Sequence, residues 1–178
     1  MLSNAMDPKL AIKSGRLELM GIAGQDENAD DGQGSLALKA AKHACKVLRH
    51  TIKKIEKQLR SFGTLKKQYS ARATVAVQED DQHVEKWQLE KTQVEGFVTK
   101  LEQFTGDAEA IALFVDELAK DGPLEDDGPD AVKNFEEKCE KRAKQCEEWR
   151  LAGEVHVQGG AHKITEMQSQ LLRDPAEW

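Results

Sequence analysis

The chain has 178 residues, of which 33% are charged and only 5% are aromatic, and its formal net charge is −6. This length allows one moderate domain or two very small ones. The composition argues against a β-sandwich and favours a protein of long helices. Only four prolines occur, and residues 9–122 contain none, which leaves room for long helices because proline is the strongest helix breaker.

Cysteine use and hydropathy predict the compartment. Three cysteines are too few, and odd in number, for a disulfide framework, so we expect an intracellular, reducing compartment without specifying an organelle. The first thirty residues have no basic start followed by an apolar run, and no run of about eighteen apolar residues occurs anywhere. A secretory signal and a membrane span are therefore not expected.

Residues 1–34 are predicted to form a flexible or strap-like acidic tail. The segment 24–34 reads GQDENADDGQG, which is acidic, glycine-rich and without apolar periodicity. The preceding residues 10–23 contain enough Leu, Ile and Met to dock on another surface. The helical part of the chain is then expected to begin after Ser35, whose hydroxyl can cap the first turn.

The first predicted helix spans 36–62 and carries the strongest pattern in the chain. Its apolar residues follow alternating spacings of three and four, an unbroken heptad pattern: Leu38, Ala41, Cys45, Leu48, Ile52, Ile55, Leu59 and Phe62. Gly63 is expected to end or kink this helix. Leu65, Tyr69, Ala73 and Ala76 could continue the pattern beyond it.

Further helices are predicted at 83–104, 107–120, 129–151 and 161–173. Asp80 or Asp81 is the expected N-cap of the second helix, and the TGD sequence at 105–107 either bends or restarts it. Two consecutive turn signals in 121–129 predict a break. The segment 151–160 is left open between helix, strand and loop, because Val155 and Val157 alternate and two glycines follow. The prediction is an all-α antiparallel bundle of coiled-coil-like helices, with one bundle domain at 35–178.

Charge is distributed unevenly. Residues 35–72 carry eleven Lys or Arg and one acid, whereas 73–178 carry twelve bases and twenty-five acids. On the first predicted helix the bases fall opposite the apolar seam and form a ribbon roughly 32 Å long. This ribbon is the predicted partner-binding site: Lys39, Lys42, Lys46, Arg49, Lys53, Lys57 and Arg60. It could be a solvated face, could pair with acidic helices of the same chain, could bind an acidic protein surface, or could follow nucleic-acid phosphates.

Catalytic and metal-binding patterns were not found, so no catalytic residue, metal or cofactor is predicted. His43 and His50 lie on the opposite side of the first helix from Cys45, so they cannot share an ion with it. Cys139 and Cys146 are about 10 Å apart along a helix, and buried apolar roles suit all three cysteines. His156 and His162 flank two glycines in what could be a loop, but no nucleophile or carboxylate pattern accompanies them.

The leading hypothesis is a non-enzymatic helical scaffold, a structural or interaction subunit within a larger assembly. It would bind a protein partner with an acidic surface, or self-associate. The alternative is a nucleic-acid-binding helical module that uses the ribbon at 39–60. A further alternative is an enzyme with an unrecognised site in the bundle, near His156 and His162.

Overall fold

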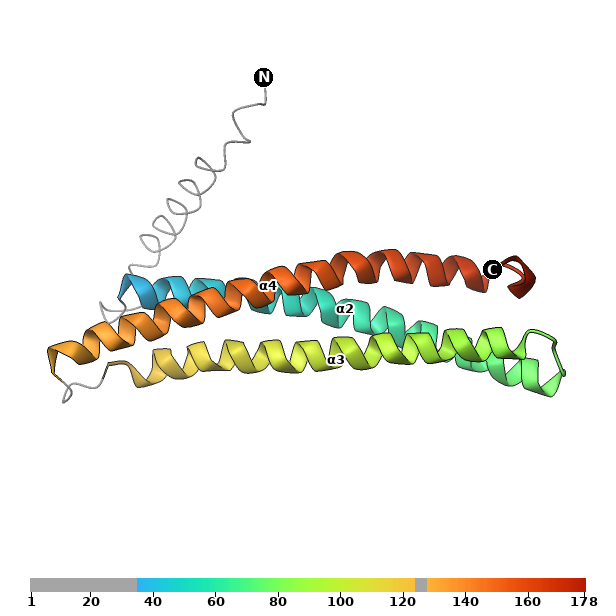
Figure 1. The fold of residues 1–178 in the computed structure, drawn as a ribbon, viewed down its shortest axis with the longest axis horizontal. Coiled ribbons are helices and arrows are strands. Elements are labelled where there is room, and N and C mark those ends of the chain that lie inside the picture. Colours follow the sequence, from blue (N-terminus) through green and yellow to red (C-terminus); the bar gives the residue numbers. More distant parts are fainter. Residues whose placement is uncertain (1–34, 124–127) are drawn as a thin grey trace, which may run out of the picture. The chain divides into compact units, whose positions relative to one another are not determined.

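The computed structural model describes residues 35–123 and 128–178, and all regular structure in this part is helical. Three long helices follow one another: α2 (Leu36–Gln78), α3 (Val84–Asp121) and α4 (Pro129–Leu171). A short 3-10 helix, η3 (Pro175–Glu177), ends the chain (Figure 1). The all-α prediction is confirmed, whereas the tail predicted for 1–34 lies outside the described residues.

The described residues form two compact units, and each long helix contributes to both. The first unit contains the described residues up to Lys46 and those within Leu113–Cys146. The second contains Val47–Ala112 and Glu147–Trp178. The second unit holds the longer stretch of each of the three helices.

Helix α2 continues sixteen residues beyond the end predicted at residue 62. Its start agrees with the prediction, since the Leu38 amide donates to Ser35 Oγ at 3.2 Å. Gly63 does not end the helix, because the described glycines with positive φ are Gly122 and Gly128. The predicted seam is buried through Phe62 except for half-buried Leu59, and it continues through buried residues beyond Gly63: Leu65, Tyr69, Ala73 and Ala76. This burial outweighs the cost of one helical glycine, which is about 1 kcal/mol.

The turn between α2 and α3 contains Asp81, one of the two N-cap candidates, but its carboxylate bonds within the turn to the residue before α3 and does not cap a helical amide. The His83 amide donates to Asp81 Oδ1 at 2.8 Å, and Asp80 takes a positive φ of 51°. Of the two options predicted at 105–107, the restart does not occur, because α3 is continuous from Val84 to Asp121. Buried Phe104 and Ala108 on either side of Gly106 hold this segment in the core.

Helix α4 is also continuous, so the separate helices predicted at 129–151 and 161–173 are one. The segment 151–160, left open from sequence, is helical throughout. Gly153 is buried and Gly160 half-buried, and they lie seven residues apart at the positions that a heptad seam requires. The apolar pattern disappears here because the seam positions hold glycine, not because the helix ends.

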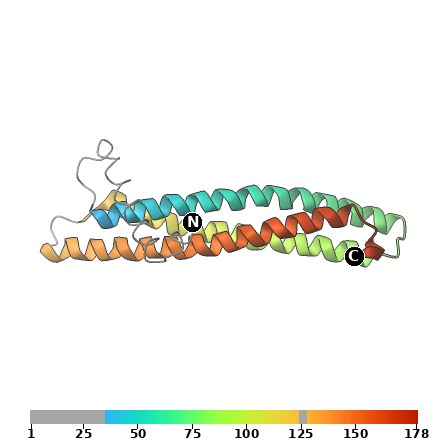
Figure 2. The same cartoon turned by 90° about the horizontal axis from the view of Figure 1, so that it is seen from above.

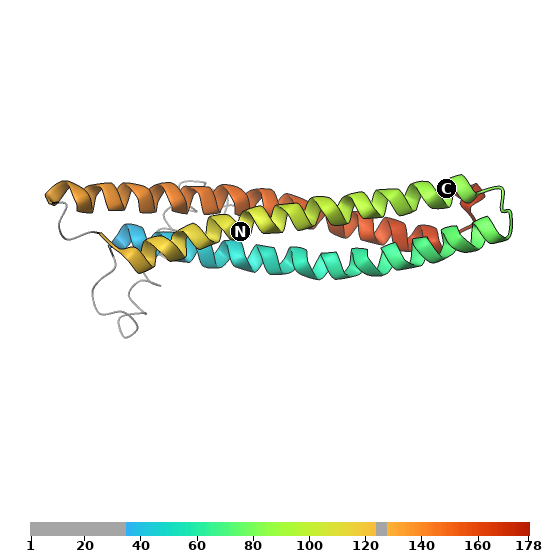
Figure 3. The same ribbon diagram turned by 90° about the horizontal axis from the view of Figure 1, so that it is seen from below.

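In the second unit α4 runs parallel to α2. Thr51 Oγ1 donates to Glu154 Oε1 at 3.0 Å, the Gln58 amide to the Val157 carbonyl at 2.6 Å, and the Tyr69 hydroxyl to the Met167 carbonyl at 2.7 Å. Residue numbers rise together on the two helices, which fixes their common direction. Figures 2 and 3 show the same neighbouring helices from two further directions.

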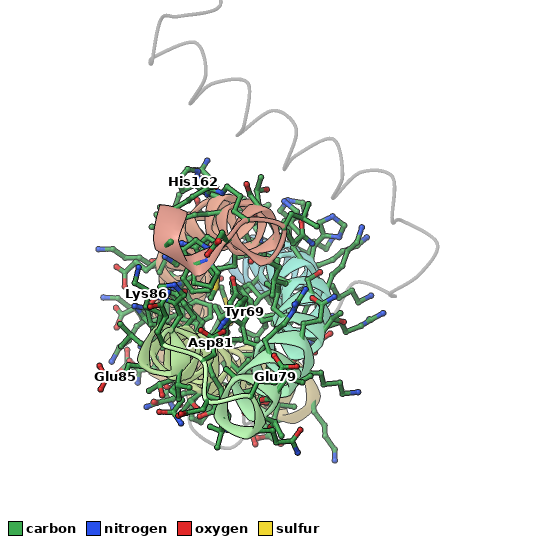
Figure 4. All side chains as sticks on the ribbon, turned by 90° about the vertical axis from the view of Figure 1, so that its right-hand side faces the viewer. Tyr69, Glu79, Asp81, Glu85, Lys86 and His162 are labelled. Atoms are coloured by element: carbon green, nitrogen blue, oxygen red, sulfur yellow. The ribbon has the colours of Figure 1, made fainter. Side chains whose placement is uncertain are left out.

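Helix α3 runs antiparallel to both partners in this unit, as aromatic contacts show. The rings of Phe62 and Phe97 stack with centroids 5.6 Å apart, and those of Tyr69 and Trp87 lie 5.9 Å apart. Trp178 packs edge-on against Trp87 at 4.6 Å, while its indole donates to the Gln170 carbonyl at 3.1 Å. In Figure 4 Tyr69 points in among the three helices. These contacts form an aromatic core beside the α2–α3 turn.

The first unit has a core of smaller residues. Leu38, Ala41 and Cys45 of α2, Val115 of α3, and Phe135, Cys139 and Cys146 of α4 are all buried. At its surface the Arg142 guanidinium lies 4.2 Å from the centroid of the Phe114 ring. That cation–π contact covers part of an exposed aromatic side chain.

Candidate functional site

The predicted ribbon lies on α2, on the side away from the buried seam. Five of its bases are exposed and two are half-buried. The exposed residues are Lys42, Lys46, Lys53, Lys57 and Arg60, and the half-buried ones are Lys39 and Arg49. Helical spacing alone separates the two faces, because the bases fall at heptad positions opposite the apolar ones.

Within the second unit the ribbon extends further than predicted. Lys67 lies seven residues after Arg60, on the same side of α2, and is exposed. The prediction missed it because the helix was expected to end at residue 62. We call Lys53, Lys57, Arg60 and Lys67 the basic face. It spans about 21 Å along the helix at 1.5 Å per residue.

The basic-face side chains form no ion pair or hydrogen bond with another residue in the part of the chain that the structure describes. Lys42 and Arg49 are not counted with them, since each has an interaction of its own. In the second unit, the interpretation that the ribbon pairs with acidic helices of the same chain therefore does not apply to these four bases. They are instead a solvated cationic surface.

A different lysine makes the ion pair between α2 and α4. Lys54 Nζ lies 3.0 Å from Glu154 Oε1, which also accepts the Thr51 hydroxyl. Hydrogen bonds from Lys54 and then from Thr51 lower the pKa of Glu154. This contact links the two parallel helices, and none of the basic-face residues takes part in it.

His156 and His162 lie on α4, not in a loop. The His156 ring packs 4.7 Å from the Phe104 ring, and burial followed by the charge of Lys100 lowers its pKa. His162 is exposed on the outer side of α4 (Figure 4). Both line a pocket of about 220 Å³, together with residues of all three helices: Phe62, Phe97, Lys100, Leu101, Val155, Gly159, Gly160 and Lys163.

The first unit has a second, more polar pocket of about 350 Å³ between α3 and α4. Its lining mixes both signs of charge with one aromatic ring: Phe114, Glu117, Leu118, Asp121, Lys138, Lys141 and Arg142. Arg142 is held against Phe114 and donates to Gln145 Oε1 at 2.7 Å. Its two acids lie on α3 and its three bases on α4, so the pocket presents both signs of charge and indicates no single ligand charge.

The cysteines have the environments expected of apolar core residues. Cys45, Cys139 and Cys146 are buried, and none of them forms a disulfide with another described residue. Burial, and then the nearby Glu136 and Glu140, raise the pKa of the Cys139 thiol, which disfavours the reactive thiolate. Among the described residues, no three His, Cys, Asp or Glu side chains gather closely enough to hold a metal ion.

None of the described helices has an apolar stretch long enough to cross a bilayer. No protein-family model, curated protein or solved structure is significantly similar to this chain.

Proposed function

We propose that this protein is a non-enzymatic helical interaction subunit, and that the basic face of α2 binds an acidic surface on a protein partner. The observation that carries the proposal is that none of its four exposed bases forms an ion pair with another described residue. They are held on one side of a continuous helix, so their spacing is fixed before any partner arrives. Fixed charges of one sign speed encounter with a complementary surface and orient it.

The surroundings of the basic face favour a protein partner over a nucleic-acid partner. The four residues include no aromatic side chain on which a base could stack, and the whole chain has a net charge of −6. Helix α3, which packs against α2 in the second unit, carries nine acids and four bases. These acids would repel phosphates that extend beyond the basic face, whereas a compact acidic protein surface need not reach them.

The test compares two variants with equal changes in net charge. One replaces the basic face: Lys53→Glu, Lys57→Glu, Arg60→Glu and Lys67→Glu. The matched control replaces four exposed bases elsewhere: Lys120→Glu, Lys133→Glu, Lys144→Glu and Arg173→Glu. Fluorescence anisotropy measures binding of a labelled ten-residue polyglutamate peptide and of a 20-base-pair DNA duplex, with circular dichroism as the check on folding.

The basic-face variant is expected to lose about tenfold in affinity for polyglutamate, from four surface contacts of a few tenths of a kcal/mol each. The control should lose far less. An equal loss in both variants would show that net charge alone attracts the peptide. Tighter binding of the duplex than of polyglutamate would replace the proposal with the nucleic-acid alternative.

A further inference from the structure

Helix α4 has an exposed side that is almost without charge. Among the twelve residues 151–162 the only acidic or basic residue, histidine aside, is Glu154, and it is already bonded to Lys54 and Thr51. Leu151 is 53% exposed and Val155 is 69% exposed, one helical turn apart. In a chain that is 33% charged, an uncharged and partly apolar helix side of this length is unusual.

The 220 Å³ pocket opens beside this side of α4, and glycine makes room for it. Val155 belongs to both the exposed apolar side and the pocket lining. A Cβ atom added to Gly159 would meet nothing within 4 Å. The Phe62 and Phe97 rings and Leu101 supply an apolar wall, so the pocket suits an apolar group.

The charged groups that line the pocket all have one sign. Lys100 and Lys163 are its lysines, and His156 and His162 its remaining titratable groups, with no acid in the lining. Lys163 lies 5.8 Å from the Phe97 ring centroid and 3.4 Å from Glu166, one turn further along α4. Lys100 has no ion pair with another described residue. An occupant with a carboxylate beside its apolar group would therefore be favoured.

The size of the pocket indicates what kind of occupant it takes. Sites for drug-sized ligands and cofactors usually measure about 300–1,000 Å³. At about 220 Å³ this pocket is smaller, and it continues onto the exposed Leu151 and Val155 side of the helix. That combination is typical of a protein interface, where one apolar anchor side chain enters a pocket and the rest of the segment lies across the surface.

We propose that this pocket is a second docking site, which receives an apolar side chain from a helical segment of a protein partner while an acidic residue of that segment pairs with Lys100 or Lys163. The proposal rests on the proposed role as an interaction subunit and names a surface on α3 and α4 for it. It does not involve Lys53, Lys57, Arg60 or Lys67, so the two sites can fail separately.

The experiment uses a synthetic alanine-rich helical peptide that carries a leucine with a glutamate four residues later. Three matched peptides change Leu to Ala, Glu to Gln, or Glu to Lys. Two-dimensional NMR of the labelled full chain follows the amide signals of Gly159 and Gly160. The amides of Gly106 and Gly122 serve as internal references, because neither residue is in the pocket lining or next to a lining residue.

Binding is expected to shift the Gly159 and Gly160 signals and to leave those of Gly106 and Gly122 unchanged. Losing the leucine should weaken binding about tenfold, the usual effect of removing an anchor side chain, and losing the glutamate should weaken it a few-fold. Equal binding of the peptide without leucine would overturn the proposal. So would signals at Gly159 that move with protein concentration alone, since a second copy of the chain would then occupy the pocket.

Variants of the protein separate the two proposed sites. Gly159→Leu fills the pocket mouth and should weaken binding about tenfold, while Gly106→Leu, at an exposed α3 glycine with equal free space, should not. Lys100→Gln with Lys163→Gln should remove the preference for glutamate over glutamine. If the basic-face variant abolished binding and Gly159→Leu had no effect, the peptide would be using the basic face, and the pocket proposal alone would fail.

Discussion

In the second unit α2 and α4 run parallel, yet they differ in which residues lie at the buried seam and which are exposed to solvent. Helix α2 buries a regular heptad of large apolar side chains and turns a row of bases to solvent. Helix α4 places Gly153 and Gly160 at its seam and leaves Leu151 and Val155 exposed. From Val47 to Lys67 no large apolar residue of α2 is exposed, and the two that are exposed in this unit, Val75 and Val77, lie near the end of the helix.

The two helices therefore fill the core differently: α2 fills it with its own side chains, whereas α4 relies on side chains of its neighbours. The seam of α2 is recognisable in isolation because its own side chains fill the core. The seam of α4 is completed by side chains of its neighbours, since Thr51, Phe104 and Gln58 occupy the space beside its glycines. Contacts between α2 and α4 should therefore matter for stability, and the basic face of α2 should not.

The largest effect is expected at Gly153. A Cβ atom there would lie 2.7 Å from Thr51 Cγ2 and 3.3 Å from Phe104 Cε1, both buried, so Gly153→Ala should lower the free energy of unfolding by about 1–3 kcal/mol. Gly159→Ala is the matched control, and it should raise that free energy by about 0.5–1 kcal/mol because its added Cβ meets nothing. Urea unfolding measures both. The same sign for both variants would contradict the close packing at Gly153.

Tyr69→Phe should have the next largest effect. It removes a hydroxyl that donates to the Met167 carbonyl at 2.7 Å and lies 3.4 Å from Gln170 Oε1, from a side chain with no exposed surface. We expect a loss of about 1–2 kcal/mol in the free energy of unfolding, by the same urea measurement. Thr64→Val is the control, since it removes an exposed hydroxyl that bonds within α2. Equal losses would mean that the Tyr69 bond contributes nothing specific to the α2–α4 contact.

The contribution of the Glu154 contact to the free energy of unfolding should depend on pH. Because its pKa is lowered in the folded protein, the stabilisation is fully present above the unfolded pKa of about 4.3 and is lost as the pH falls through the lower folded value. Glu154→Gln should therefore lower the free energy of unfolding by about 0.2–1 kcal/mol at pH 7, a small effect because both side chains of the pair are partly exposed. In strong acid the substitution should change that free energy by almost nothing. Unfolding measured from pH 7 to pH 3 checks this. Glu148→Gln, at an exposed position of α4 without an ion pair to another described residue, is the matched control.

The smallest effect is expected on the basic face. Lys57→Ala removes an exposed side chain without a partner among the described residues, so the free energy of unfolding should change by less than about 0.5 kcal/mol. Lys54→Ala, at the neighbouring exposed lysine that pairs with Glu154, should cost more. If thermal unfolding showed Lys57→Ala to be the more harmful of the two, the basic face would have a structural role and would lose its claim to be a free binding surface.

The sequence by itself determined the helical class, the seam of α2 and the row of bases opposite it. Heptad spacing repeats over many residues, and on a regular helix spacing alone decides which side chains share a face. The Ser35 cap and the turn at Asp81 were also predictable, because these residues bond to backbone amides within their own turns.

Only the tertiary structure decided that three helices are continuous where five were predicted. Gly63, Gly106, Gly153 and Gly160 weaken a helix locally, and a single chain segment offers no sign that neighbours will compensate. The pocket likewise has no pattern in the sequence, since it requires Phe62 of α2, Phe97 of α3 and Gly159 of α4 to meet. Local spacing fixes which face a side chain occupies, but only packing between helices fixes which side chain of another helix fills the space beside it, and which space stays open.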